Sequence, residues 1–318
     1  VLSKATLAAA LASALLAWNC RSLLSDVWLV RLNNAWPGGS FLAFAEDGRE
    51  CLAVYRFSSG AGLLLDNGAA WHNPETSAKR EAHLPLLMHG SARSVLLIGA
   101  RHPATLAAAR AHGLETTSLD PHPDAGAVLR SQAADGRPPA GIKTIRADPR
   151  GYLRRAGPAY DAIIVETPFP AHAPEAARLV TMEAMAEVRA RLAPGGVAAW
   201  RLPAPYSHMS RERTIQAARR TFAHTGGFRL PGGWLLICSQ QPLDSGPAAL
   251  RARLGPRVRA DDAALADDLS KLPWAASAPD DSKAARPDTD DRLRGTLSLP
   301  AIWSGRIFTA ETAEAPVL

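Results

Sequence analysis

The fold is decided by residues 93–120, RSVLLIGARHPATLAAARAHGLETTSLD, in the first half of the chain. Val95–Ile98 is an apolar run too short for a helix and too apolar for an exposed strand, which predicts a strand buried on both faces of a parallel sheet. Gly99 ends this strand. Thr105–His112 is rich in alanine and leucine, which are strong helix formers, and Gly113 supplies a stop. The stretch therefore predicts a strand, a tight turn and a helix.

A second short strand, Glu115–Leu119, leads from this helix to Asp120. Dinucleotide-type folds place an acidic residue about 20 positions after the turn glycine, where its carboxylate holds a ribose hydroxyl. Asp120 has this spacing from Gly99, although the following Pro121 also fits a helix start with no ligand. The turn GARHP, 99–103, has one glycine where a nucleotide-binding turn normally carries more. We therefore expect a nucleotide-binding topology with an altered turn.

Strand-like and helical segments alternate through the rest of residues 73–240. Apolar runs predict strands at Ile142–Arg146, Tyr160–Val165, Val197–Leu202 and Gly233–Ser239. Helices are predicted at Asn73–His89, Glu175–Leu192 and Arg211–His224, the second of them stopped by Pro194-Gly195-Gly196. This alternation predicts an α/β fold with a doubly wound, mostly parallel sheet, the Rossmann-like arrangement.

Two different segments precede and follow this core. Residues 26–72 hold short strand-like runs separated by turn signals such as Pro37-Gly38-Gly39, which predicts a small antiparallel β domain. Residues 241–318 begin with a charged helical stretch and continue into a part rich in Pro, Asp and Ser, which predicts a helical and loop extension.

Residues 1–25 are expected to form an N-terminal apolar helix. The run at residues 5–18 is shorter than the roughly 20 residues that a membrane-spanning helix needs. Trp18 and Asn19 are too large for the cleavage site of a signal peptide before Cys20. A helix that packs on a core and an uncleaved membrane anchor both remain open. We expect a cytoplasmic protein, with membrane association through residues 5–18 as the alternative.

Composition argues against several functions. The formal net charge is +6, but the basic residues are scattered and form no long run, so we expect no nucleic-acid binding. Cys20, Cys51 and Cys238 lie far apart and form no metal-binding or disulfide pattern. The histidines form no HxxxH pair on a helix, so no metal site is expected.

Several short segments, taken in their order, resemble the polyamine aminopropyltransferases, or spermidine synthases, and in particular their bacterial spermidine-synthase-like branch. They are LLLDNG (63–68), HLPLLMH (83–89), SVLLIG (94–99), SLDP (118–121), ADPRGYL (147–153), YDAIIVE (160–166), LAPGGVAAW (192–200) and PDTDDR (287–292). The resemblance implies a small N-terminal β domain on a Rossmann-like class I methyltransferase core. It also implies transfer of an aminopropyl group from decarboxylated S-adenosylmethionine to a diamine.

The resemblance implies a cofactor site, with changes. The family's glycine-rich turn corresponds to Gly99 and the residues after it, where Arg101 and His102 either bind an anion or fill the space of the cofactor. Its ribose-binding Glu corresponds to Ser118, with Asp120 nearby. Its pair that recognises adenine corresponds to Ala147-Asp148. From the sequence alone, Asp148 is equally a helix cap.

On the catalytic side, the family's base corresponds to Glu166, which keeps a carboxylate but lengthens it by one methylene. Glu166 is also interpretable as a loop acid without a catalytic role. The second acid of that loop corresponds to Phe169, and the Tyr-His-Glu cluster that helps to seat the polyamine corresponds to Ser77-Ala78-Lys79. A dication would therefore meet an apolar ring and a like charge where the family provides acids.

These changes predict a spermidine-synthase-like protein whose aminopropyltransferase site is degenerate. The first hypothesis is a non-catalytic scaffold or interaction subunit, with a protein partner or a second copy of itself and without a cofactor. The second is an active transferase that uses S-adenosylmethionine or its decarboxylated form, for aminopropyl or methyl transfer, with an altered acceptor. Both hypotheses share the same predicted fold.

Overall fold

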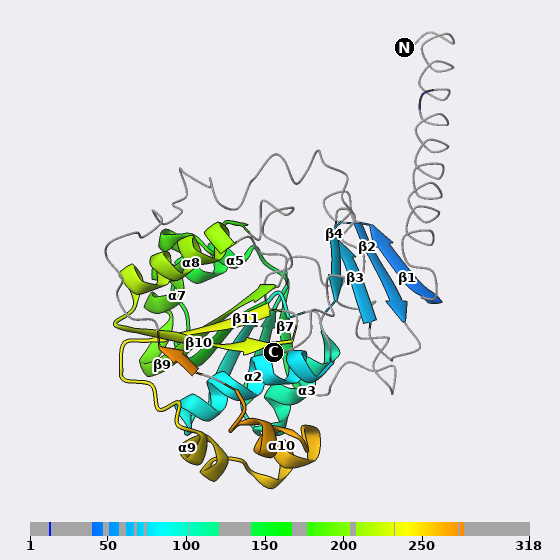
Figure 1. The fold of residues 1–318 in the computed structure, drawn as a ribbon. Coiled ribbons are helices and arrows are strands. Elements are labelled where there is room, and N and C mark those ends of the chain that lie inside the picture. Colours follow the sequence, from blue (N-terminus) through cyan, green and yellow to red (C-terminus); the bar gives the residue numbers. More distant parts are fainter. Residues whose placement is uncertain are drawn as a thin grey trace.

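The computed structural model describes residues 13, 40–46, 51–56, 62–66, 69–72, 75–100, 102–120, 141–166, 177–203, 208–231, 233–272 and 274–276. In this part of the chain the strands form two sheets (Figure 1). The smaller sheet is antiparallel and has the order β1-β2-β3-β4. Its strands are β1 (Ser40–Glu46), β2 (Cys51–Arg56), β3 (Gly62–Asp66) and β4 (Ala69–His72). The first three correspond to predicted runs, whereas β4 was not predicted.

The larger sheet has eight strands in the order β12-β10-β11-β9-β8-β5-β6-β7. Five neighbouring strands are parallel: β5 (Ser94–Ile98), β6 (Glu115–Leu119), β7 (Ile142–Ile145), β8 (Tyr160–Val165) and β9 (Leu192–Pro203). The chain moves from β5 outward to β6 and β7, and then returns to β8 on the other side of β5. This reversal is the point at which such sheets bind ligands. The predicted α/β fold with a mostly parallel sheet is confirmed.

The other end of this sheet differs from the prediction. β11 (Gly233–Ser239) runs antiparallel to β9, and β10 (His224–Leu230) and β12 (Trp274–Ala276) continue the antiparallel order. β10 was not predicted, because its glycines, Gly226 and Gly227, are typical of a turn. They are needed for packing, since a Cβ on Gly226 would lie 2.2 Å from the Trp274 ring of β12.

The predicted helix at 175–192 was wrong at both ends in the described part. α7 is Met182–Ala190 and begins at Thr181, whose Oγ1 accepts a hydrogen bond from Ala184 N at 3.2 Å. β9 begins at Leu192, so Pro194-Gly195-Gly196 lies inside a strand and does not mark the end of a helix. A proline and two glycines are tolerated in this irregular first part of the strand.

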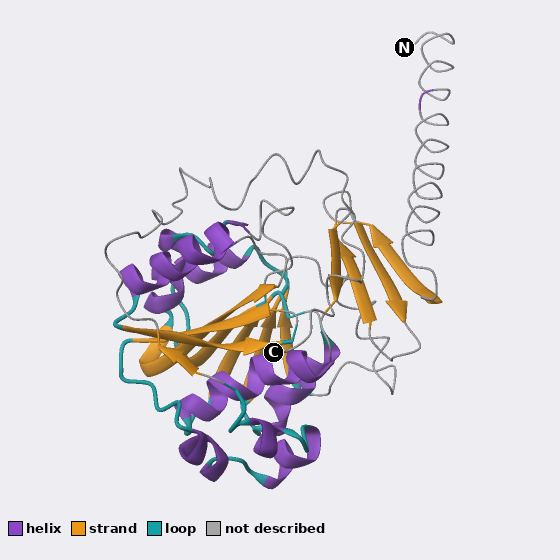
Figure 2. Cartoon of the chain, viewed as in Figure 1, coloured by secondary structure: helices purple, strands orange, loops and turns teal. Residues whose placement is uncertain are grey.

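Helices cover both faces of the larger sheet (Figure 2). One face carries α2 (Glu75–His89) and α3 (Pro103–Ala111), with α9 (Pro247–Ala252), α10 (Pro256–Asp261) and α11 (Leu265–Asp268) packed beyond them. The other face carries α5 (Pro149–Arg154), α7 and α8 (His208–Thr221). Residues 241–276 therefore include the predicted helical part of the extension, while its predicted loop lies mostly outside the described residues.

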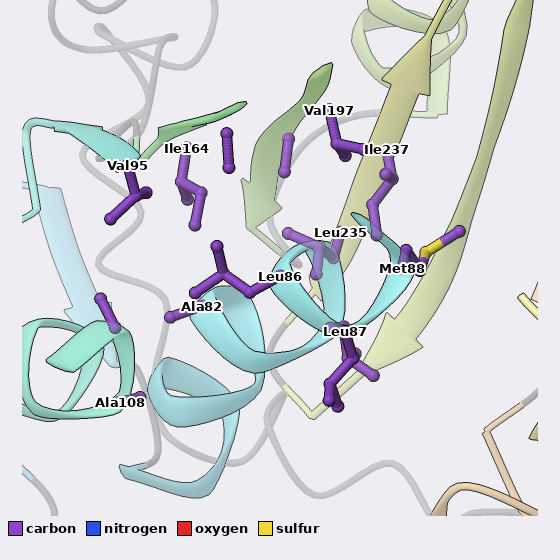
Figure 3. Close-up of a cluster of buried hydrophobic side chains, with 14 of the residues drawn as sticks. Ala82, Leu86, Leu87, Met88, Val95, Ala108, Ile164, Val197, Leu235 and Ile237 are labelled. Carbon is purple, nitrogen blue, oxygen red and sulfur yellow. The ribbon is translucent and has the colours of Figure 1, made fainter. Parts of the chain in front are cut away.

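The core on the α2 side is built from alternate residues of the strands. Figure 3 shows Ala82 and Leu86 of α2 facing Val95 of β5, Ile164 of β8 and Val197 of β9. All five are buried. Because α2 sits directly on the central strands, its first turn is brought to the edge of the sheet where the parallel strands end.

The N-terminal predictions fall almost entirely outside the described residues, which include only Ser13 of the run 5–18. Among the residues that the structure does describe, no helix has the length and apolar character to cross a membrane. The division of the chain at residues 25, 72 and 240 stays a prediction.

A polar cluster fastens the C-terminal helices to α2 and α3. His83, which is fully buried, lies 3.0 Å from His112 Nε2 through its Nδ1 and 3.0 Å from Asp261 Oδ2 through its Nε2. On the same helix, Arg80 donates to Asp262 at 3.3 Å and to Asp268 at 2.5 Å. The C-terminal helices are therefore held by buried charge-assisted contacts as well as by apolar packing.

The cluster predicts a pH-dependent stability. Burial, together with the charge of His83, lowers the pKa of His112 to about 4. His112 therefore stays neutral in the folded protein while the unfolded chain takes up its proton below about pH 6.5. Stability from this group is fully present above pH 6.5, and we expect a loss on the order of 2 kcal/mol as the pH falls to about 4.

Urea unfolding measured between pH 7.5 and pH 4 tests this expectation. His112→Gln keeps a donor for His83 and removes the titrating group, so its stability should fall less over the same range. The same pH slope in both proteins would show that other groups cause it.

Candidate functional site

Three of the predicted site residues meet at the edge where the parallel strands end. Gly99 follows β5 and donates its N–H to Leu119 O at 2.9 Å, and Glu166 follows β8 and donates its N–H to Ile98 O at 2.9 Å. Asp120 follows β6 and donates its N–H to Ile145 O at 3.1 Å. The sheet ladder thus continues through all three residues and fixes their backbones side by side. This is the edge at which open α/β sheets bind ligands.

Gly99 lies in the left-handed backbone region, with φ of 68°. A Cβ at this position would lie 2.7 Å from the backbone oxygen of Glu166. Both facts require glycine here. The turn therefore keeps the one glycine that brings the ends of β5 and β8 together.

Replacing Gly99 by alanine is expected to lower the free energy of unfolding by about 1–3 kcal/mol, because the new methyl group meets the Glu166 carbonyl in a strained backbone conformation. Thermal or urea unfolding measures the loss. Gly255→Ala is the matched control, since a Cβ there would meet nothing within 4 Å. Equal effects of the two substitutions would contradict this account of the turn.

The side chains that follow Gly99 have structural uses. Ala100 is 1% exposed and belongs to the hydrophobic core on the α2 side, so its methyl group is part of the core. His102 is the N-cap of α3 and accepts a hydrogen bond from Ala104 N through Nδ1 at 3.1 Å. Arg101 lies outside the described residues. The contact that His102 makes is therefore that of a helix cap.

Ser118, the position of the family's ribose-binding Glu, is buried on β6 opposite Leu97 of β5. Its side chain is 1% exposed, and its Oγ makes no hydrogen bond within the described part of the chain. A buried hydroxyl of this kind favours a polar partner. Ser118 therefore places a neutral hydroxyl where the resemblance implied a charged ribose acceptor.

The pair predicted to recognise adenine follows β7. Asp148 is exposed and caps α5, because its Oδ2 accepts a hydrogen bond from Gly151 N at 2.6 Å. Ala147 is partly buried against the core on the α5 side. The sequence allowed two roles for Asp148, and the structure shows the hydrogen bond of one of them, the helix cap.

Sequence reasoning missed a buried ion pair near Glu166, which is itself only 3% exposed. Arg201 of β9 binds Glu81 of α2 through its Nε, 2.5 Å from Oε1, with side chains 3% and 2% exposed. The available signal was Arg201 itself, a charged residue inside the apolar strand VAAWRL. Such a residue needs a buried partner.

The residues at the positions that correspond to the family's polyamine cluster make contacts within the protein. Ser77 is buried and donates to Pro231 O at 2.7 Å, and Ala78 is buried in the core. Lys79 donates to Asp261 O at 2.8 Å and pairs with Glu75 at 3.0 Å. Burial acts to lower the pKa of Lys79, but these acidic neighbours raise it above the ordinary value, so it stays charged. Phe169 lies outside the described residues.

The described residues contain no group of His, Cys, Asp and Glu side chains that could hold a metal ion. Within the described residues, the candidate site consists of two strand-end carboxylates, one buried hydroxyl and one buried guanidinium.

Comparisons with known proteins give a match in structure and none in sequence. No family model matches the chain, and no curated protein matches it. Among solved structures, a spermidine synthase in complex with the transition-state analogue AdoDATO has a TM-score of 0.55 at 14% identity, covering 82% of this chain and 85% of that one.

Two further structures are similar to the same extent. The spermidine synthase of Thermotoga maritima has a TM-score of 0.54 at 14% identity, with coverage of 82% of this chain and 85% of that one. A probable spermidine synthase of Corynebacterium glutamicum has a TM-score of 0.54 at 14% identity, with coverage of 79% and 97%. The chain therefore has the Rossmann-like fold of the spermidine synthases.

Proposed function

We propose that this protein has the fold of a spermidine synthase without its aminopropyltransferase activity, and that it acts as a non-catalytic scaffold or interaction subunit. Its partner would be another protein or a second copy of the chain. The observation that carries the proposal is the first turn of α2. There Ser77 and Lys79 hold Pro231 and Asp261 in place, and neither offers a carboxylate to a substrate.

The energetics of a diamine support the proposal. At neutral pH a diamine is a dication, and each charge-assisted hydrogen bond that seats it contributes about 1.5–3 kcal/mol. A site that lacks two such acids loses roughly two to four powers of ten in affinity. Glu166, as a base without a seated amine, would contribute little, because proton transfer requires the acceptor to be held against it.

Calorimetric titration with methylthioadenosine, S-adenosylmethionine and decarboxylated S-adenosylmethionine tests the proposal. We expect no saturable heat from any of the three. Binding of one of them at micromolar concentration would contradict the scaffold proposal and support the second candidate.

The second candidate is a transferase that uses S-adenosylmethionine or its decarboxylated form with another acceptor. It is favoured by the buried Ser118 hydroxyl and by two carboxylates, Asp120 and Glu166, at the ends of β6 and β8, the two strands that flank β5. Ser118 and Asp120 would hold the ribose, and Glu166 would accept the proton of the acceptor. When bound, the sulfonium compound would supply the electrophilic carbon, and its sulfur would leave as a neutral thioether when the C–S bond breaks. Incorporation of labelled methyl or aminopropyl groups, lost in Glu166→Gln, would identify this activity.

A further inference from the structure

The ion pair between Glu81 and Arg201 lies directly beside Glu166 in the sheet. β8 and β9 run parallel, with Val165 opposite Trp200. Glu166 and Arg201 are the next residues along these two strands, and paired residues of neighbouring strands lie side by side. Arg201 is also fixed from its other side by β11, where it pairs with Leu235.

The alternation of side chains places both residues on the α2 face of the sheet. Trp200 and Leu202 flank Arg201 and belong to the core on the α8 side, so Arg201 faces α2, where it binds Glu81. Ile164 belongs to the core on the α2 side, and Glu166, two positions later, follows the same alternation. A buried guanidinium therefore stands next to the carboxylate that corresponds to the family's catalytic base.

We propose that Arg201, held by Glu81, is the residue that excludes alkylammonium groups from the acceptor side of this site, because it acts as an internal counter-ion of Glu166. The inference rests on the proposed function, in which diamine binding is lost. It adds that the loss is caused by a residue outside the positions that correspond to the polyamine cluster.

The expected effect follows from charge repulsion. An ammonium group hydrogen-bonded to Glu166 would lie about 5 Å from the guanidinium, and in the weakly screened interior that repulsion lowers affinity by roughly a hundredfold. Lys79 does not play this role in the structure, because its ammonium group is turned to α10, where it donates to Asp261 O. Removal of Arg201 and removal of Lys79 should therefore have different effects on the affinity for a diamine.

Titration of the protein with putrescine, followed by amide NMR shifts, distinguishes the effect of Arg201 from that of Lys79. The wild-type protein should give no saturable shifts at millimolar putrescine. Glu81→Gln combined with Arg201→Gln removes the ion pair and leaves Glu166 as the carboxylate that an ammonium group can bind, so this variant should bind putrescine at least about tenfold more tightly. Adding Glu166→Gln should abolish this gain. Lys79→Gln alone should give no gain.

Each outcome bears on a different claim. Saturable putrescine binding by the wild-type protein would refute the proposed function and this inference together. No gain in the double variant, or an equal gain in Lys79→Gln, would refute the role of Arg201 and leave the proposed function standing. If the glutamine pair does not fold, Glu81→Leu with Arg201→Met makes the same test, since apolar replacements of a buried ion pair are commonly tolerated.

Discussion

Replacing Arg201 by alanine alone is expected to lower the free energy of unfolding by about 3–5 kcal/mol, one of the two largest effects expected in this protein. The substitution leaves Glu81 as a carboxylate that is 2% exposed and has lost the guanidinium at 2.5 Å. Burial of a charge without its partner costs far more than the pair itself contributes. Urea unfolding at neutral pH measures the loss.

The matched control is the double substitution Glu81→Leu with Arg201→Met. It removes both charges of the pair, and only Glu166 loses a neighbouring guanidinium, so its stability should lie well above that of Arg201→Ala. A single variant as stable as the double one would show that the pair is solvated and would remove the basis for its role beside Glu166.

The second large effect is expected at Arg150 of α5, which is 2% exposed. Its guanidinium makes a forked contact with Glu187 of α7, at 2.6 Å from each carboxylate oxygen, and donates to Arg178 O at 3.2 Å. Arg150→Ala should therefore lower the free energy of unfolding by about 3 kcal/mol or more, because three hydrogen bonds and a buried stem are lost together.

Arg154 provides the control for this prediction, because it contacts the same carboxylate. Its Nε lies 2.7 Å from Glu187 Oε1, but its side chain is 54% exposed. Exposed ion pairs contribute little, so Arg154→Ala should cost less than about 1 kcal/mol. Similar losses in the two variants would contradict the view that burial decides the strength of these contacts.

The parallel half of the sheet was predictable from the sequence because its strands are buried on both faces. Such strands consist of continuous apolar runs, and the runs at Val95–Ile98 and Tyr160–Val165 coincide with or lie within β5 and β8. The antiparallel end was less predictable. β10 contains Gly226 and Gly227 and depends on packing against Trp274, a residue far away in the sequence.

Residues of the candidate site that are placed by the order of the strands could be predicted from the sequence. Contacts that depend on how side chains pack could be predicted less well. Gly99, Asp120 and Glu166 follow three strands of one sheet, so their meeting at one edge followed from the topology. The pairing of Glu81 with Arg201 depends on how α2 lies on β9, which the sequence pattern does not specify. The cap made by Asp148, by contrast, was one of the two roles that the sequence allowed, because Asp148 directly precedes Pro149 at the start of α5.

An assay of spermidine formation from putrescine and decarboxylated S-adenosylmethionine, with methylthioadenosine release as a second readout, tests the proposed loss of aminopropyltransferase activity most directly. We predict product at the level of the buffer blank, because Ser77, Ala78 and Lys79, at the positions of the family's polyamine cluster, offer no acid to a diamine and Arg201 stands beside Glu166. Turnover clearly above the blank that is abolished by Glu166→Ala would contradict it.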